Sequence, residues 1–320
     1  MRFAVTIMLM SLAAPAVARD ILLGLPIACD LGETCDIQQF VDHDPSDAAS
    51  DFACGSLTYD GHKGTDFALL SRAMIAAGVD VIAAAPGTVR GVRDEMPDIL
   101  QGQTGAPDTD GRECGNGMVI NHGNGWETQY CHLKRGTITV QSGDRVAMGD
   151  ILGQVGMSGQ TEFPHLHLSL RHNGAVVDPF DPDGTITCGV TDDTLWATPV
   201  ATPAGGLISA GFAPDVPDYD EIKAGDAAAE SLAPNNNLVL WGYAFGGQTG
   251  DVMITTITRP DGTTIEARAD PLDRPKAQYF RAGGRRAPST GWPVGTYTGA
   301  VTIERNGASF DVMTTMITFR

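Results

Sequence analysis

The chain has 320 residues, and its 39 Asp and Glu against 21 Lys and Arg give a formal net charge of -18 at pH 7. Such an acidic surface repels nucleic acid and anionic lipid, and no basic cluster offsets it, so we expect neither as a partner. A chain of this length is longer than those that usually fold around a single hydrophobic core, so it predicts two domains.

The first residues predict a secretory signal peptide over residues 1–18. Arg2 precedes an apolar run from Phe3 to Ala14, and the small residues at 16–18 suit cleavage. An apolar run of about 12 residues is too short to span a bilayer, which needs roughly 20. We therefore expect export to a periplasmic or secreted location, without membrane insertion.

Six cysteines in an exported chain predict three disulfides. One favoured pair closes a tight loop, a second flanks an apparent hairpin, and the third follows by elimination and would join the start of the first domain to its end. These pairs are Cys29–Cys35, Cys114–Cys131 and Cys54–Cys188.

Residues 19–54 are predicted as an N-terminal disulfide-containing segment and residues 55–196 as the first domain. From residue 80 to 180 this domain reads as short β-rich runs separated by glycine turns. Asn124-Gly125 and Asn173-Gly174 are typical of type I′ hairpins, in which both central residues need positive φ. The pattern predicts a glycine-rich antiparallel sheet folded on itself. Residues 91–113 lack periodicity and predict a long surface loop, either a wall of a substrate cleft or a passive insertion.

The remainder of the chain predicts a second domain. Residues 197–217 read as a proline-punctuated linker. From 218 to 320, short alternating strands with turns at Asp261-Gly262 and Asn306-Gly307 predict a β-sandwich of immunoglobulin-like type. This module holds no histidine and no cysteine, so we expect an accessory role, such as binding a protein partner. The expected fold class is therefore all-β and mainly antiparallel.

Two segments supply side chains that suit a metal. His165 and His167 are two apart in a predicted strand and project to one face, as two ligands or as one ligand beside a catalytic imidazole. His62 and Asp66 flank Gly64 in a turn-rich segment, where the backbone can curl so that both groups converge. Two histidines and one carboxylate are typical of a catalytic zinc site with a fourth position for water.

The remaining histidines divide into two groups. His132 follows Cys131 at the end of a predicted strand, where a disulfide would stiffen its position. The other three are expected to be exposed loop residues: His43, His122 and His172.

Three stretches, 61–67 (GHKGTDF), 130–133 (YCHL) and 164–167 (PHLH), resemble the motifs of the LytM/lysostaphin-type zinc metallopeptidases, peptidase family M23. The resemblance covers roughly residues 55–182 and leaves the C-terminal module outside. It implies a folded β-sheet peptidase domain, and an enzyme that cleaves peptide bonds in peptidoglycan, in stem-peptide cross-links or bridges.

The resemblance also implies a role for each motif residue. His62, Asp66 and His167 would hold one Zn²⁺ per chain, and His132 and His165 would form the catalytic pair, with the general base and the oxyanion donor unassigned between them. The family often has an acidic residue where this chain has Ser169. No H-E-x-x-H or G-x-S-x-G motif offers a different mechanism.

The sequence thus predicts an exported zinc metalloendopeptidase that acts on cell-wall peptide. Two alternatives stay open. One is a non-catalytic relative of the same family that regulates or binds cell-wall hydrolases, and the other is a zinc endopeptidase acting on proteins outside the wall.

Overall fold

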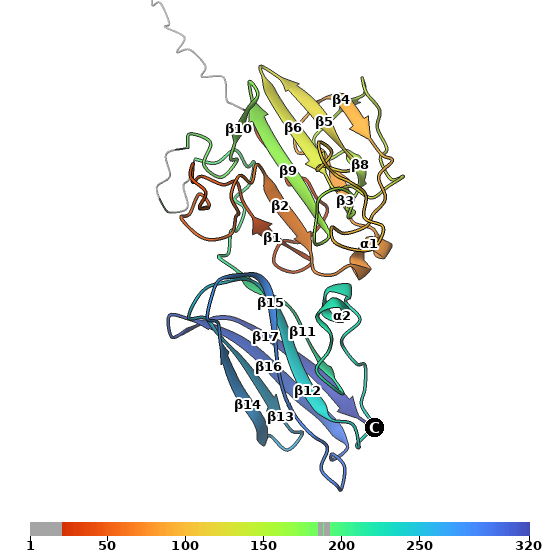
Figure 1. The fold of residues 1–320 in the computed structure, drawn as a ribbon, viewed down its shortest axis with the longest axis vertical. Helices are drawn as coiled ribbons and strands as arrows, with labels where there is room; N and C mark the ends of the chain where they lie inside the picture. Colours follow the sequence, from red (N-terminus) through yellow and green to blue (C-terminus); the bar gives the residue numbers. More distant parts are fainter. Residues whose placement is uncertain (1–20, 185–187, 189–192) are drawn as a thin grey trace, which may run out of the picture.

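A computed structural model describes residues 21–184, 188 and 193–320 (Figure 1). The signal peptide predicted at residues 1–18 lies outside this range. No helix within the described residues is long and apolar enough to cross a membrane.

The described residues form two β-rich bodies. The first contains β1 (Cys35–Gln39), β2 (Thr65–Leu69), α1 (Ala73–Ala77), β3 (Asp80–Ile82), β4 (Gly87–Arg93), β5 (Gly117–Gly123), β6 (Trp126–Cys131), β7 (Arg145–Val146), β8 (Ile151–Gln154), β9 (His165–His172) and β10 (Ala175–Val177). The second contains β11 (Gly206–Ala213), α2 (Tyr219–Ala224), β12 (Leu238–Gly247), β13 (Val252–Thr258), β14 (Thr264–Pro271), β15 (Lys276–Arg285), β16 (Gly295–Arg305) and β17 (Ala308–Phe319).

An antiparallel sheet of eight strands dominates the first body. Its order is β1-β2-β9-β6-β5-β4-β7, and β10 pairs with β9, while β3 and β8 form a separate two-stranded sheet. Leu166, Leu168 and Leu170 of β9 are at most 1% exposed and face the core. Because side chains alternate along a strand, the odd-numbered residues of β9, among them His165 and His167, lie on the opposite face.

Two predicted hairpins of the first body are confirmed. Strand β5 pairs with β6 and β9 pairs with β10, and the turn residues Asn124 and Asn173 have φ of 49° and 53°. The expected surface loop at 91–113 is corrected, because β4 extends to Arg93 and the irregular stretch that follows is anchored by buried Met96 and Leu100. The apolar side chains of this stretch are irregularly spaced, so the sequence showed no strand or helix periodicity, although two of them are buried in the domain.

The second body is a β-sandwich, as the sequence predicted. A three-stranded sheet, β11-β12-β15, stands beside a four-stranded sheet, β14-β13-β16-β17, and the chain crosses between them from β12 to β13, from β14 to β15 and from β15 to β16. This arrangement is typical of immunoglobulin-like sandwiches. One expectation was wrong: β11 lies inside the segment 197–217 that was predicted as a linker, since its glycines and the flanking prolines masked a short strand.

All three predicted disulfides are formed, Cys29–Cys35, Cys54–Cys188 and Cys114–Cys131. The N-terminal segment is not separate from the first body, because β1 pairs with β2 at the edge of the main sheet.

The two bodies share a contact surface at the end of the first body where β1 and α1 lie (Figure 1). Gln278 of β15 donates a hydrogen bond of 2.7 Å to Gln38 of β1. Trp241, Tyr243 and Phe245 of β12 are buried in the same hydrophobic cluster as the core of the first body. The second body is therefore packed against the first through apolar side chains and polar contacts together.

Candidate metal centre and active site

The three expected zinc ligands meet where β2 pairs with β9. Asp66 stands opposite His167 in the register, and His62 reaches the same point from the turn before β2. The distance from His62 Nε2 to His167 Nδ1 is 3.1 Å, and Asp66 Oδ1 lies 3.2 Å from the former and 2.8 Å from the latter. Tetrahedral ligands 2.0–2.1 Å from a zinc ion lie about 3.3 Å from one another, so this donor set fits one small cation.

Outer hydrogen bonds fix which nitrogen of each ligand faces the centre. The Nδ1 of His62 donates to the Phe40 carbonyl oxygen at 2.6 Å, which leaves the Nε2 lone pair for the metal. The Nε2 of His167 lies 2.9 Å from Ser169 Oγ, which leaves its Nδ1 toward Asp66. The hydroxyl of Ser169 thus contacts the His167 nitrogen that faces away from the expected metal position. Ser169 stands where the family often has an acidic residue.

The two expected catalytic histidines lie beside this group. The ring centroids of His132 and His165 are 4.6 Å apart, and His165 Nε2 lies 3.6 Å from Asp66 Oδ1. The Nδ1 of His132 donates to the Ser158 carbonyl oxygen at 2.8 Å, and the Nδ1 of His165 lies 3.0 Å from the Phe163 carbonyl oxygen. Each ring therefore keeps its Nε2 free of these backbone contacts, as a proton acceptor or donor needs.

His132 occupies a specific backbone position. Its φ is +64°, in the left-handed region that a non-glycine residue rarely adopts. The disulfide at Cys131 and a hydrogen bond of 2.9 Å from the His132 amide to the Cys114 carbonyl oxygen hold it there. The conformation directs the imidazole back toward the expected metal ligands, 6.0 Å from the His167 ring.

Burial and mutual charge set the protonation of the group. Burial alone would raise the pKa of Asp66, but the nearby His62 and His165 lower it by more, so the pKa of Asp66 lies well below its ordinary value. Burial, aided by the neighbouring His165 and His167, holds the pKa of His132 well below the usual range, and burial also lowers the pKa of His165. These shifts favour a carboxylate at Asp66 and neutral imidazoles at His132 and His165, the forms that a carboxylate ligand and a general base require. Burial of His62 works against its charged form, but Asp66 outweighs it and raises the pKa of His62.

Supporting residues of this site gave no signal in the sequence. Phe40, Ser158 and Phe163 act through main-chain carbonyl oxygens, which any residue type could supply. Asn116 holds the Ser158 segment, since its main-chain N–H donates to Ser158 Oγ at 2.9 Å. Thr161 Oγ1 lies 3.1 Å from His165 Nδ1. Side-chain pattern alone could not have identified them.

The other three histidines are not the exposed loop residues that the sequence predicted. His43 bonds to Asp178 at 2.9 Å, His122 lies within β5, and His172 ends β9 and stacks on Trp126 at 4.3 Å between ring centroids. All three are partly buried rather than exposed, because nearby acceptors and aromatic rings cover them.

Comparison with known proteins agrees with this geometry. Residues 60–179 match the family model of peptidase family M23. This segment belongs to peptidase family M23. The M23 segment includes all five residues of the expected site.

Two curated relatives and one solved structure illustrate the similarity. The DD-carboxypeptidase/endopeptidase Mpg of Neisseria meningitidis is 42% identical over 65 residues, which cover 20% of this chain and 14% of Mpg. The peptidoglycan DD-endopeptidase ShyA of Vibrio cholerae is 32% identical over 117 residues, 37% of this chain and 22% of ShyA. The catalytic domain of the prophage-encoded M23 protein EnpA from Enterococcus faecalis is 24% identical with a TM-score of 0.33, over 49% of this chain and 95% of that domain. The chain thus spans less than a quarter of either curated relative.

Proposed function

We propose that the protein is an exported zinc metalloendopeptidase that hydrolyses peptide bonds in peptidoglycan. The observation that carries the proposal is the convergence of His62 Nε2, Asp66 Oδ1 and His167 Nδ1, whose ligand atoms all lie within 4.8 Å of one another in an M23 segment. The similarity to ShyA, a peptidoglycan DD-endopeptidase, supports a peptidoglycan substrate. Three disulfides support an oxidising compartment outside the cytoplasm.

The residues divide the chemistry between them. When bound, zinc would lower the pKa of a coordinated water to about 7 and polarise the scissile carbonyl. His62, Asp66 and His167 would hold the ion. His132 and His165 would each present Nε2 beside the ion, because their Nδ1 atoms face main-chain carbonyl oxygens, so that one could take a proton from the attacking water while the other donates to the developing oxyanion.

Zinc content and muropeptide release from purified sacculi test the proposal together. The wild-type protein should bind one zinc ion and release peptide fragments. His167→Ala should lose the metal, whereas His165→Ala should keep it and lose about 10²- to 10⁴-fold in turnover. The matched control is His172→Ala, which lies on the same strand away from the site and should keep both properties.

The alternatives predict other outcomes. A non-catalytic regulator would release no fragments even with zinc bound, and no expected ligand is missing from this chain to favour that reading. A peptidase with a different substrate would bind zinc, leave sacculi intact and cleave members of a protein panel. Absence of bound zinc from the wild-type protein would contradict the metal site itself.

A further inference from the structure

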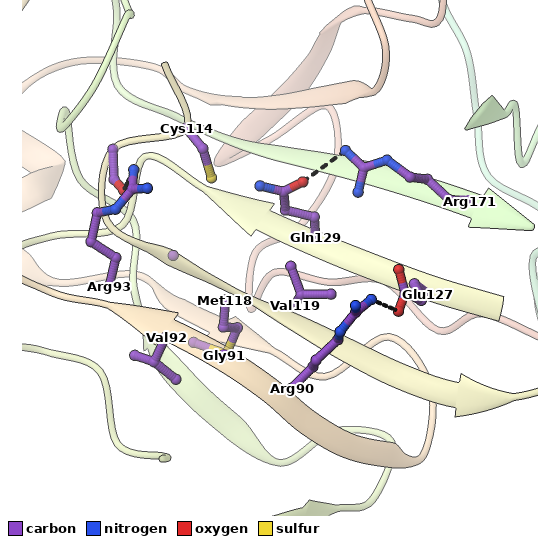
Figure 2. A pocket seen from close by; sticks show the side chains of 12 residues that line it. Arg90, Gly91, Val92, Arg93, Cys114, Met118, Val119, Glu127, Gln129 and Arg171 are labelled. Carbon is purple, nitrogen blue, oxygen red and sulfur yellow. Dashed lines mark hydrogen bonds and ion pairs between the residues drawn. The ribbon is translucent and has the colours of Figure 1, made fainter. Parts of the chain in front are cut away.

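A basic groove lies on the same face of the main sheet as the candidate active site. It encloses about 410 Å³, and its charged lining residues are Arg90, Arg93, Arg171 and Glu127 (Figure 2). Three arginines against one glutamate make it locally cationic in a chain whose formal net charge is -18. A cationic groove on so acidic a protein attracts anionic groups to one place.

The strand register joins the groove to the active site. On β9 and β6, His167 pairs with Cys131, Ser169 pairs with Gln129, and Arg171 pairs with Glu127. Paired residues in an antiparallel sheet share a face, so these side chains form a continuous path. At about 3.3 Å per residue, Arg171 stands roughly 13 Å along β9 from the expected metal ligand.

The groove begins beside the catalytic pair. Cys114 and Gly115 line it, and the Cys114 carbonyl oxygen accepts the main-chain hydrogen bond of His132. The disulfide from Cys114 to Cys131 therefore lies between the groove and the candidate active site. A peptide that reaches the site across this face would pass over the groove.

Arg171 is the best placed of the three arginines to bind a ligand. This residue is partly buried, and its guanidinium donates a hydrogen bond of 2.7 Å from Nη2 to Gln129 Oε1 (Figure 2). Arg90 is paired with Glu127, and Arg93 donates to the Gly115 carbonyl oxygen. The forked donors of a guanidinium match a carboxylate with two parallel bonds, and Gln129 fixes the fork in place.

We propose that Arg171 binds a free carboxylate of the substrate, about 13 Å along β9 from the expected metal ligand His167. The inference rests on the proposed function and specifies its substrate class, an acidic peptide rather than an amidated or neutral one. Arg171 binds substrate at a distance from the reacting atoms, so its removal raises KM with little change in kcat.

Cleavage of matched substrates tests the inference. Sacculi with free carboxyl groups are compared with the same sacculi after carbodiimide-mediated amidation. Wild-type kcat/KM should fall about ten- to a hundredfold on amidated material, the loss expected for a charge-assisted hydrogen bond. Arg171→Gln should show the same loss on native sacculi and no discrimination between the two, and Arg171→Lys should be intermediate.

Controls separate this inference from the proposed function. Arg286→Gln, an exposed arginine of the second body, should behave as wild type, and Arg171→Gln should keep the zinc content and thermal midpoint of the wild type. If the wild-type protein cleaves both substrates equally, or if Arg171→Gln still discriminates, the inference is overturned while the proposed function stands. If zinc-bound wild type cleaves neither, the proposed function fails and the inference fails with it.

Discussion

Replacement of Gly64 by alanine should weaken zinc binding without removing any ligand. A Cβ at this position would lie 2.6 Å from His167 Nε2 and 2.6 Å from the Leu168 carbonyl oxygen. Since the carbonyl belongs to the sheet, the imidazole must retreat by about 1 Å to restore ordinary contact. Metal–ligand distances tolerate only about ±0.2 Å, so the displaced ring no longer completes the site.

We expect Gly64→Ala to lose about ten- to a hundredfold in zinc affinity, the range seen when a contact that orients a ligand is lost. The extra methyl should also cost about 1–3 kcal/mol in unfolding free energy. Zinc affinity is measured by competition with a chelator. Gly91→Ala is the control, because nothing lies within 4 Å of its Cβ position. Wild-type zinc affinity in Gly64→Ala would show that the space beside His167 does not limit how the ligand is placed.

Three further results are expected. Replacing both Cys114 and Cys131 by serine should cost about 3 kcal/mol in denaturant-measured stability and reduce turnover, and equal stability would contradict a structural role. The pKa of His43 is raised mainly by its hydrogen bond to Asp178, although burial also raises the pKa of Asp178. This bond therefore contributes its full stability below pH 6.5, the ordinary pKa of histidine, and the contribution is lost as the pH rises through the raised pKa of His43. His43→Ala should flatten the pH dependence of the unfolding free energy in this range. Ser169→Ala removes the outer bond of a ligand imidazole and should lower zinc affinity about tenfold, while unchanged affinity would show that solvent replaces the hydroxyl.

The sequence predicted features whose cause is local. Asn124-Gly125 and Asn173-Gly174 specify hairpins because these residues accept positive φ, and both turns adopt it. Alternation placed His165 and His167 on one face, and the motifs around His62 brought a carboxylate toward them. The disulfides could be predicted because two of the pairs are local, and once these are chosen the six cysteines leave a single remaining pair.

What the sequence did not predict depends on long-range contacts. The partners of His62 and His132 are main-chain carbonyl oxygens of Phe40 and Ser158, and nothing in those residue types marks them. Arg171 stood in an ordinary alternating strand, and its position in a groove emerged only from the register of β6 against β9. Strand β11 was hidden by glycine and proline, which reduce strand propensity without preventing pairing at a sheet edge.

Strand β1 limits how the protein can be divided for experiments. Gln38 of this strand accepts a hydrogen bond from Gln278 of the second body. One residue beyond the end of the strand, the Phe40 carbonyl oxygen accepts the Nδ1 hydrogen bond of His62 and so selects its tautomer. A shortened chain that ends before β11 would uncover this edge strand and the apolar surface that meets Trp241. The sandwich is thus better regarded as part of the scaffold of the first body than as a detachable tail, and we expect a fragment without it to be less stable.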